Sequence, residues 1–196
     1  KIAMRDLEIR GAGSLLGEIQ SGHLEQVGYD TYCKLLDEVV KEMKGIKVTE
    51  EADVQVDLKV TCYIPDNYIE ESGQKIEVYQ KIALCRTEED IQNVIDELID
   101  RYGNMPKELE SLLEVARIKQ LAKEQNIAKV ESKQNGVVFT FTSSENIKYY
   151  KAELVRKYGN KIKFSAGIKP MITYKTDNAK EQELLKQVKE FLMVNE

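Results

Sequence analysis

The clearest hydrophobic pattern in the chain lies between Thr87 and Gly103. Apolar residues recur there at intervals of three and four positions: Ile91, Val94, Ile95, Leu98, Ile99 and Tyr102. This spacing is typical of a helix that buries one face. Thr87 is a candidate N-cap with Asp90 at the reciprocal position of a capping box, and the glycine closes the helix. A second helix is predicted from Pro106, a residue tolerated at a helix start, to about Glu124.

The remainder of the second half alternates short strands with helices. Four strands are predicted, at 128–133, 137–142, 162–165 and 171–174. Asn135-Gly136 joins the first two and is typical of a tight hairpin turn. One helix is expected from Glu145 to Tyr158, where Gly159 ends it. The chain closes with an amphipathic helix whose apolar face comprises Leu184, Leu185, Val188, Phe191 and Leu192.

The first half has a different pattern. Val54, Val56, Leu58 and Val60 alternate with polar residues, which is the period of a half-buried strand. Pro65 ends this strand and Ser72-Gly73 marks a turn. We therefore predict an α+β protein in three parts. A helical hairpin with a glycine-rich loop occupies 1–45, an extended linker arm occupies 46–74, and an α+β domain occupies 75–196, with a small, mostly antiparallel sheet packed by helices.

Composition narrows the class of protein. The chain is 42% hydrophobic and 32% charged, as in an ordinary globular protein. It has no signal-peptide pattern and no apolar run long enough for a membrane span. Cys33, Cys62 and Cys85 form no CxxC pair and His23 is the lone histidine, which disfavours a metal site or a disulfide framework. We expect reduced thiols and a cytoplasmic protein. The chain opens at Lys1 within a helical pattern, so we expect a piece of a longer protein.

Charge is distributed unevenly around a net value of −5. Residues 87–114 hold nine acids and two bases, whereas residues 117–169 hold twelve Lys and Arg and four Glu. The net charge disfavours a simple DNA-binding module. The acidic region is either a docking surface for a basic partner or a solvated helix face. The basic region either meets phosphates or is an ordinary solvated surface.

The string from Asp6 to Gly22, DLEIRGAGSLLGEIQSG, carries the strongest motif. Gly11 and Gly13 allow backbone angles closed to other residues, while Arg10 and Gln20 can project from the loop with several hydrogen-bonding groups. The string is neither a Walker A loop nor a GxGxxG fingerprint. By residue types alone it could also be a capped helix connection in which Arg10 pairs with Asp6.

Residues 1–36, KIAMRDLEIRGAGSLLGEIQSGHLEQVGYDTYCKLL, closely resemble the motif that follows the second RecA-like motor domain in two families of double-stranded DNA translocases. One family is RecG and the other is the transcription-repair coupling factors (Mfd). The flanks of the loop resemble the coupling factors, as does ELIDRYGNMPKELESLLEVARIKQLA at 97–122. The resemblance covers most of the chain and is thinner after about residue 140.

The resemblance implies an ATP-dependent double-stranded DNA translocase that couples transcription to nucleotide-excision repair by displacing stalled RNA polymerase and recruiting UvrA. ATP and Mg would bind upstream motor domains of the parent protein, and this piece would have no catalytic activity alone. The loop would couple ATP hydrolysis to movement on DNA. The positions that match its coupling motif are Arg5, Arg10, Gly11, Gly13, Gln20, Ser21 and Gly22.

The acidic domain would have a second role in this family. It resembles a clamp that packs on the UvrB-like N-terminal module of the same protein and hides the surface that recruits UvrA. Glu97 and Asp100 are the candidates for that autoinhibitory contact. Two alternatives remain open: a stand-alone acidic protein-interaction module, and a fragment of a RecG-like helicase.

Overall fold

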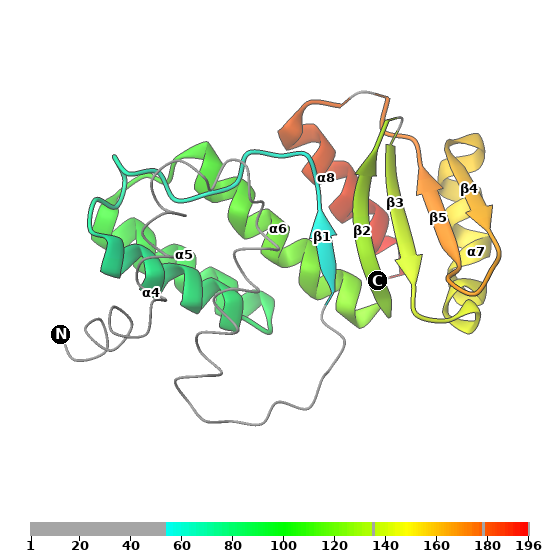
Figure 1. The fold of residues 1–196 in the computed structure, drawn as a ribbon, viewed down its shortest axis with the longest axis horizontal. Helices are drawn as coiled ribbons and strands as arrows, with labels where there is room; N and C mark the ends of the chain where they lie inside the picture. Colours follow the sequence, from blue (N-terminus) through cyan, green and yellow to red (C-terminus); the bar gives the residue numbers. More distant parts are fainter. Residues whose placement is uncertain (1–53, 135, 178, 196) are drawn as a thin grey trace. The chain divides into compact units, whose positions relative to one another are not determined.

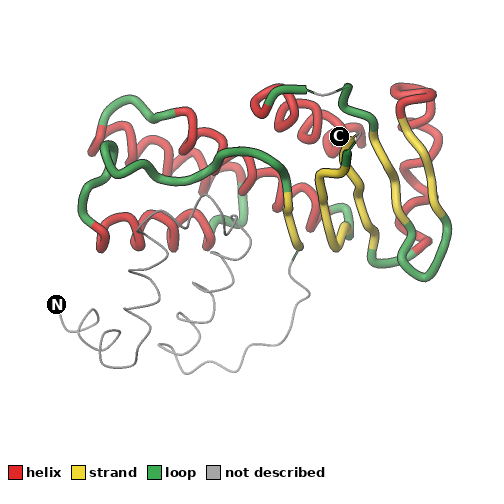
Figure 2. Tube along the Cα trace, turned by 45° about the horizontal axis from the view of Figure 1, so that its top comes forward, coloured by secondary structure: helices red, strands yellow, loops and turns green. Residues whose placement is uncertain are grey.

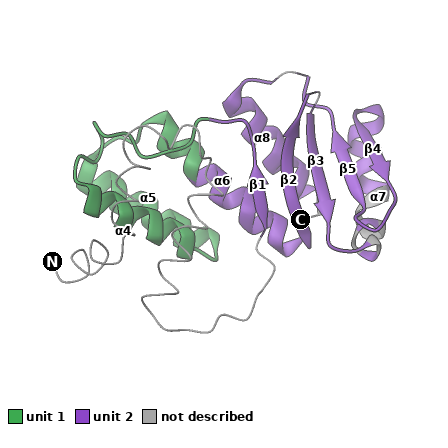
Figure 3. Cartoon of the chain, viewed as in Figure 1, with its two compact units in different colours: residues 1–49, 61–112 green, residues 50–60, 113–196 purple. Residues whose placement is uncertain are grey.

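The computed structural model describes residues 54–134, 136–177 and 179–195. The predicted coupling loop, from Arg5 to Gly22, lies outside the described residues. The chain divides into two compact units (Figure 3). Unit 1 takes its described residues from 61–112, and unit 2 combines the short segment up to Val60 with the chain from Leu113 onward.

Unit 1 is helical. It contains α4 (Ser72–Leu84), α5 (Glu88–Tyr102) and the start of α6 (Lys107–Glu124), which ends in unit 2. The sequence pattern predicted α5 and α6 and placed only a turn at Ser72-Gly73, where the structure begins α4. The apolar residues of that helix do not all fall on one face, since Leu84 is exposed, so its periodicity is weak. Its buried residues are nevertheless one face of a helix: Lys75, Val78, Tyr79 and Ile82.

Unit 2 is built on a five-stranded sheet of order β1-β2-β3-β5-β4 (Figure 1). Its strands are β1 (Gln55–Asp57), β2 (Ile127–Lys133), β3 (Gly136–Phe141), β4 (Ile162–Ser165) and β5 (Met171–Tyr174). β1 runs parallel to β2, and the other neighbouring strands are antiparallel. The α+β class and the mostly antiparallel sheet are confirmed. The strand predicted near Val56 thus joins this sheet through its pairing with Val130.

Helices α7 (Ser144–Tyr158) and α8 (Glu181–Leu192) lie on one face of the sheet (Figures 1 and 2). Short 3-10 helices follow them, at Gly159–Lys161 and Met193–Asn195. Strand register explains the burial, because Val130, Phe139 and Ile172 are aligned across three strands and each is 0% exposed. The opposite row, Glu131, Val138 and Thr173, is half-buried.

Aromatic side chains fill the core under this sheet. Phe139 of β3 stacks on Phe191 of α8 with ring centroids 4.3 Å apart. Tyr174 stacks on the same phenylalanine at 5.2 Å, and Tyr158 of α7 meets Tyr174 at 4.9 Å. Burial raises the pKa of Tyr158 to about 12. One continuous aromatic cluster therefore ties both helices to the sheet.

The β2–β3 hairpin depends on a glycine. The sequence predicted this hairpin with its turn at Asn135-Gly136. The hairpin is confirmed, but Gly136 is already the first residue of β3 and pairs with Lys133 at the end of the ladder, so the connection comes one residue earlier. A Cβ atom at Gly136 would overlap the carbonyl oxygen of Tyr174 on the neighbouring strand β5. The glycine is required here because another backbone passes too close for any side chain.

Candidate interaction surface on helix α5

Helix α5 begins with the capping box that its sequence predicted. The Thr87 hydroxyl accepts a hydrogen bond from the Asp90 amide at 3.1 Å, and the Asp90 carboxylate accepts from the Thr87 amide at 2.8 Å. The Arg86 amide donates to the same carboxylate at 2.8 Å and is the largest cause of the lowered pKa of Asp90. The helix ends at Gly103, whose φ of 81° suits glycine. Both ends of α5 are thus fixed locally.

The body of the helix is held by apolar packing and by tyrosine hydroxyls of unit 1. Ile91, Val94 and Leu98 are its buried residues. The Tyr68 hydroxyl lies 3.1 Å from the carbonyl oxygen of Leu98 and 3.1 Å from that of Gly103. These contacts fix the rotation of α5 in its unit, and therefore decide which acidic side chains face outward.

Glu97 is occupied by contacts within unit 1. Its carboxylate accepts hydrogen bonds from Lys81 Nζ of α4 at 2.6 and 2.8 Å, and one from Arg101 at 2.8 Å. The Lys81 hydrogen bond is the largest cause of the lowered pKa of Glu97, and the same bond raises the pKa of Lys81. The sequence could not show this ion pair because it did not predict α4.

Asp100 lies one turn further along α5 in a different environment. It is exposed, and no cationic side chain of the described residues forms an ion pair with it. Glu89 and Asp96 are also exposed, and Asp96 accepts a hydrogen bond from Gln92 at 2.9 Å. We call Glu89, Asp96 and Asp100 the acidic stripe. The spacing of its three carboxylates along the helix can select a partner with positive charges at matching positions.

Ile99 adds an apolar contact beside this stripe. The sequence pattern placed it on the buried face of the helix, but the structure leaves 46% of it exposed. It lies at the edge of that face, three residues after Asp96 and next to Asp100, so the 3.6-residue period carries it towards solvent. Sequence reasoning missed this residue because a hydropathy pattern does not mark where a buried face ends.

Charged residues alone do not create a metal centre here. Among the described residues, no group of three or more His, Cys, Asp or Glu is placed to hold a metal ion. Nor does any helix of the described part have the length and apolar character of a membrane span. The arrangement on α5 is suited to binding a basic surface.

Residues 58–152 match the family model described as the TRCF domain. The transcription-repair-coupling factor of Bacillus subtilis is 40% identical over 166 residues, which cover 83% of this chain and 14% of that protein. The protein of the same name from Staphylococcus epidermidis is 47% identical over 121 residues, 61% of this chain and 10% of its own length. The chain belongs to the transcription-repair coupling factor family.

A solved structure agrees with this membership at the level of the fold. The chain resembles the crystal structure of the C-terminal domain of a transcription-repair coupling factor with a TM-score of 0.65 and 23% identity. The match covers 72% of this chain and 91% of that one. Helix α5 and the strand pair β2–β3 both lie inside the matched TRCF domain. The chain spans 14% or less of the length of the coupling factors from the two species above.

Proposed function

We propose that this chain is part of an ATP-dependent double-stranded DNA translocase that couples transcription to nucleotide-excision repair. In this proposal the whole protein works in the cytoplasm, displaces stalled RNA polymerase and recruits UvrA. ATP and Mg bind its motor domains, and residues 1–196 alone hydrolyse no ATP. Family membership supports the proposal, as does the match of residues 1–36 to the translocation motif. Within that motif, Arg10 and Gln20 transmit the stroke of the motor.

The acidic domain restrains the protein in this proposal. The observation that supports it is the exposed Asp100, which has no cationic partner among the described residues and lies beside the half-exposed Ile99. An apolar side chain flanked by carboxylates suits a contact with basic residues around an apolar patch. The proposed partner is the UvrB-like N-terminal module of the same protein, and the contact covers the surface that UvrA needs.

Glu97 and Asp100 then contribute differently. Glu97 already accepts hydrogen bonds from Lys81 and Arg101, so a new partner would have to replace existing ones. Asp100 has no such competition within the described part of unit 1. Charge reversal at Asp100 should therefore release the restraint with little cost to folding, whereas reversal at Glu97 also breaks the link between α4 and α5.

The test is UvrA binding by the full-length protein carrying Asp100→Lys. Loss of an interdomain coupling of typical size should tighten UvrA binding by about 5- to 150-fold. Glu153→Lys is the matched control. Glu153 is exposed on α7, and its substitution changes the net charge by the same amount at a different site. If Asp100→Lys and the Glu97→Lys/Asp100→Lys double variant both leave UvrA binding and basal ATP hydrolysis unchanged, the proposed restraint is wrong.

A further inference from the structure

The sheet of unit 2 has a second face, which its helices do not cover. Register places Glu131, Val138, Thr173 and Lys163 in one row across four strands. The neighbouring row contains Lys129, Thr140, Met171 and Ser165. Helices α7 and α8 pack against the opposite face, which carries Phe139 and Ile172 (Figures 1 and 2). Within the described part of unit 2, this second face is therefore open to solvent.

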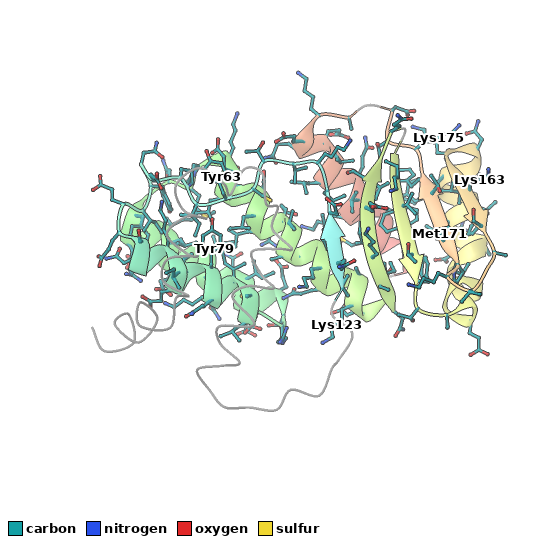
Figure 4. The ribbon with its side chains drawn as sticks, viewed as in Figure 1. Tyr63, Tyr79, Lys123, Lys163, Met171 and Lys175 are labelled. Atoms are coloured by element: carbon teal, nitrogen blue, oxygen red, sulfur yellow. The ribbon has the colours of Figure 1, made fainter. Side chains whose placement is uncertain are left out.

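From β2 to β4, charges on this open face are paired at the β2 side and unpaired at the β4–β5 side, and β1 adds the exposed carboxylate of Asp57 next to Glu131. On β2, Glu131 forms ion pairs of 2.8 Å with both Lys129 and Lys133. On the β4–β5 side, Lys163 and Lys175 are exposed and form no ion pair with any described carboxylate. Figure 4 labels both lysines at this side of the sheet, with Met171 lower on β5. We call Lys163 and Lys175 the β4–β5 lysine pair.

The chain segment that carries this pair contains few acids. Residues 159–180 contain five lysines and a single acid, Asp177. Asp177 pairs with Lys161 at 2.7 Å, and that hydrogen bond is the largest cause of its lowered pKa. Lys175 adds a smaller, long-range lowering of the same pKa without forming an ion pair with Asp177. This segment therefore carries a local excess of positive charge, although the whole chain carries −5.

The residue types on the open face favour one kind of negatively charged partner over others. The core of a protein–protein interface is enriched in aromatic side chains and depleted in lysine, whereas this face has lysine and threonine with Val138 half-buried. No aromatic residue occupies the two open-face rows of the described strands. A single-stranded nucleic acid would need aromatic platforms for its bases. A duplex has its bases stacked inside and presents phosphates, which lysine binds as a point charge.

We propose that the open face of the unit 2 sheet, through Lys163 and Lys175, binds the phosphate backbone of duplex DNA without sequence preference. The contact would be weak, because two lysines neutralise few phosphates. It would give the coupling factor a DNA contact outside the proposed motor domains. It rests on residues of unit 2 alone, so it can be right or wrong independently of the restraint proposed for α5.

The experiment measures the binding of residues 1–196 to a fluorescent 20-base-pair duplex of arbitrary sequence by anisotropy, at KCl concentrations from 50 to 200 mM. The Lys163→Gln/Lys175→Gln variant should bind roughly tenfold or more weakly at the lowest salt, because each lost phosphate contact removes about 0.9 from the slope of log K against log salt. The slope should therefore become shallower by about 1.8. Lys163→Arg/Lys175→Arg keeps both charges and should restore both quantities.

Lys107→Gln/Lys186→Gln is the matched control. Both lysines are exposed on helices, at the start of α6 and on α8, and their loss changes the net charge by the same amount. The control should retain the wild-type slope. Equal loss of binding in the control would reduce the effect to overall charge and overturn the proposal. So would an unchanged slope in the β4–β5 variant, or the absence of any duplex binding at the lowest salt, which an acidic protein partner would predict.

Discussion

The two units of this chain are stabilised by different means and carry opposite unpaired charges. Unit 1 holds its helices together with aliphatic contacts, tyrosine hydroxyls and the ion pair between Lys81 and Glu97. Unit 2 relies on its sheet and on the aromatic cluster around Phe139. Asp100 has no ionic partner in the described part of unit 1, and Lys163 has none in the described part of unit 2. The comparison separates charges that stabilise a fold from charges that can meet a partner.

A count of charges along the sequence does not separate charges that stabilise the fold from charges that are available to a partner. The acidic segment at 87–114 includes Glu97, which forms ion pairs inside the unit, and Asp100, which forms none with the described residues. The basic segment includes Lys129, which pairs with Glu131, and Lys163, which forms no ion pair in the part of the chain that the structure describes. An exposed ion pair contributes at most about 1 kcal/mol to folding. An exposed charge without an ionic partner is instead available to a partner molecule, where complementary charges favour association.

The strongest test of the contrast concerns the core of unit 2. Phe139→Ala should lower the free energy of unfolding of this unit by about 3–5 kcal/mol, since the ring is 0% exposed and stacks on Phe191. The measurement is urea denaturation followed by tyrosine fluorescence. Val138→Ala is the control, because the next residue on the strand faces the open side and is half-buried. Equal losses from the two variants would show that the assigned faces of the sheet are wrong.

A smaller effect is expected at the β2–β3 hairpin. Gly136→Ala places a methyl group against the Tyr174 carbonyl oxygen, so β3 and β5 must separate. We expect a loss of about 1–3 kcal/mol in the same denaturation experiment, as for other overpacked sites. Gly167→Ala is the matched control, because its added Cβ meets nothing within 4 Å. A Gly136→Ala protein as stable as the control would contradict the close approach of these two backbones.

Local signals in the sequence were sufficient for most elements of this fold. Thr87, Asp90 and Gly103 fix the ends of α5 through short-range hydrogen bonds and backbone angles, which a sequence displays directly. The sequence also predicted the strands at 162–165 and 171–174 and the presence of the β2–β3 hairpin. The sequence did not predict α4, because its apolar residues show no clear helical period. The buried face of this helix is evident only from its packing in unit 1.

The candidate surfaces were less predictable because they depend on distant residues. Nothing near Glu97 in the sequence indicates that Lys81, sixteen residues earlier, neutralises it. In the same way, the exposure of Lys163 depends on a strand order that places β4 at the edge of the sheet, next to β5. The partition into 1–45, 46–74 and 75–196 stays a prediction, as do the roles of Arg10 and Gln20. The described residues do show β1, within the expected linker arm, paired with β2.

The smallest predicted effect concerns the ion pair of unit 1 and its dependence on pH. The pKa of Glu97 is lowered in the folded protein, chiefly by the hydrogen bond from Lys81. The stabilisation is therefore fully present above the unfolded pKa of about 4.3 and is lost as pH falls through the lower folded value. Glu97→Gln should cost about 0.2–1 kcal/mol at pH 7 and nothing in acid below the folded pKa.

Denaturation curves between pH 2.5 and 7 measure this difference against Asp100→Asn, which removes a carboxylate without a described cationic partner. The Glu97→Gln curve should converge on wild type in acid, while Asp100→Asn should follow wild type throughout. Equal pH-dependent losses at both positions would mean that Asp100 also serves the fold of unit 1. In that case its charge could not be assigned to a partner, and the contrast between the paired and the unpaired acid of α5 would fail.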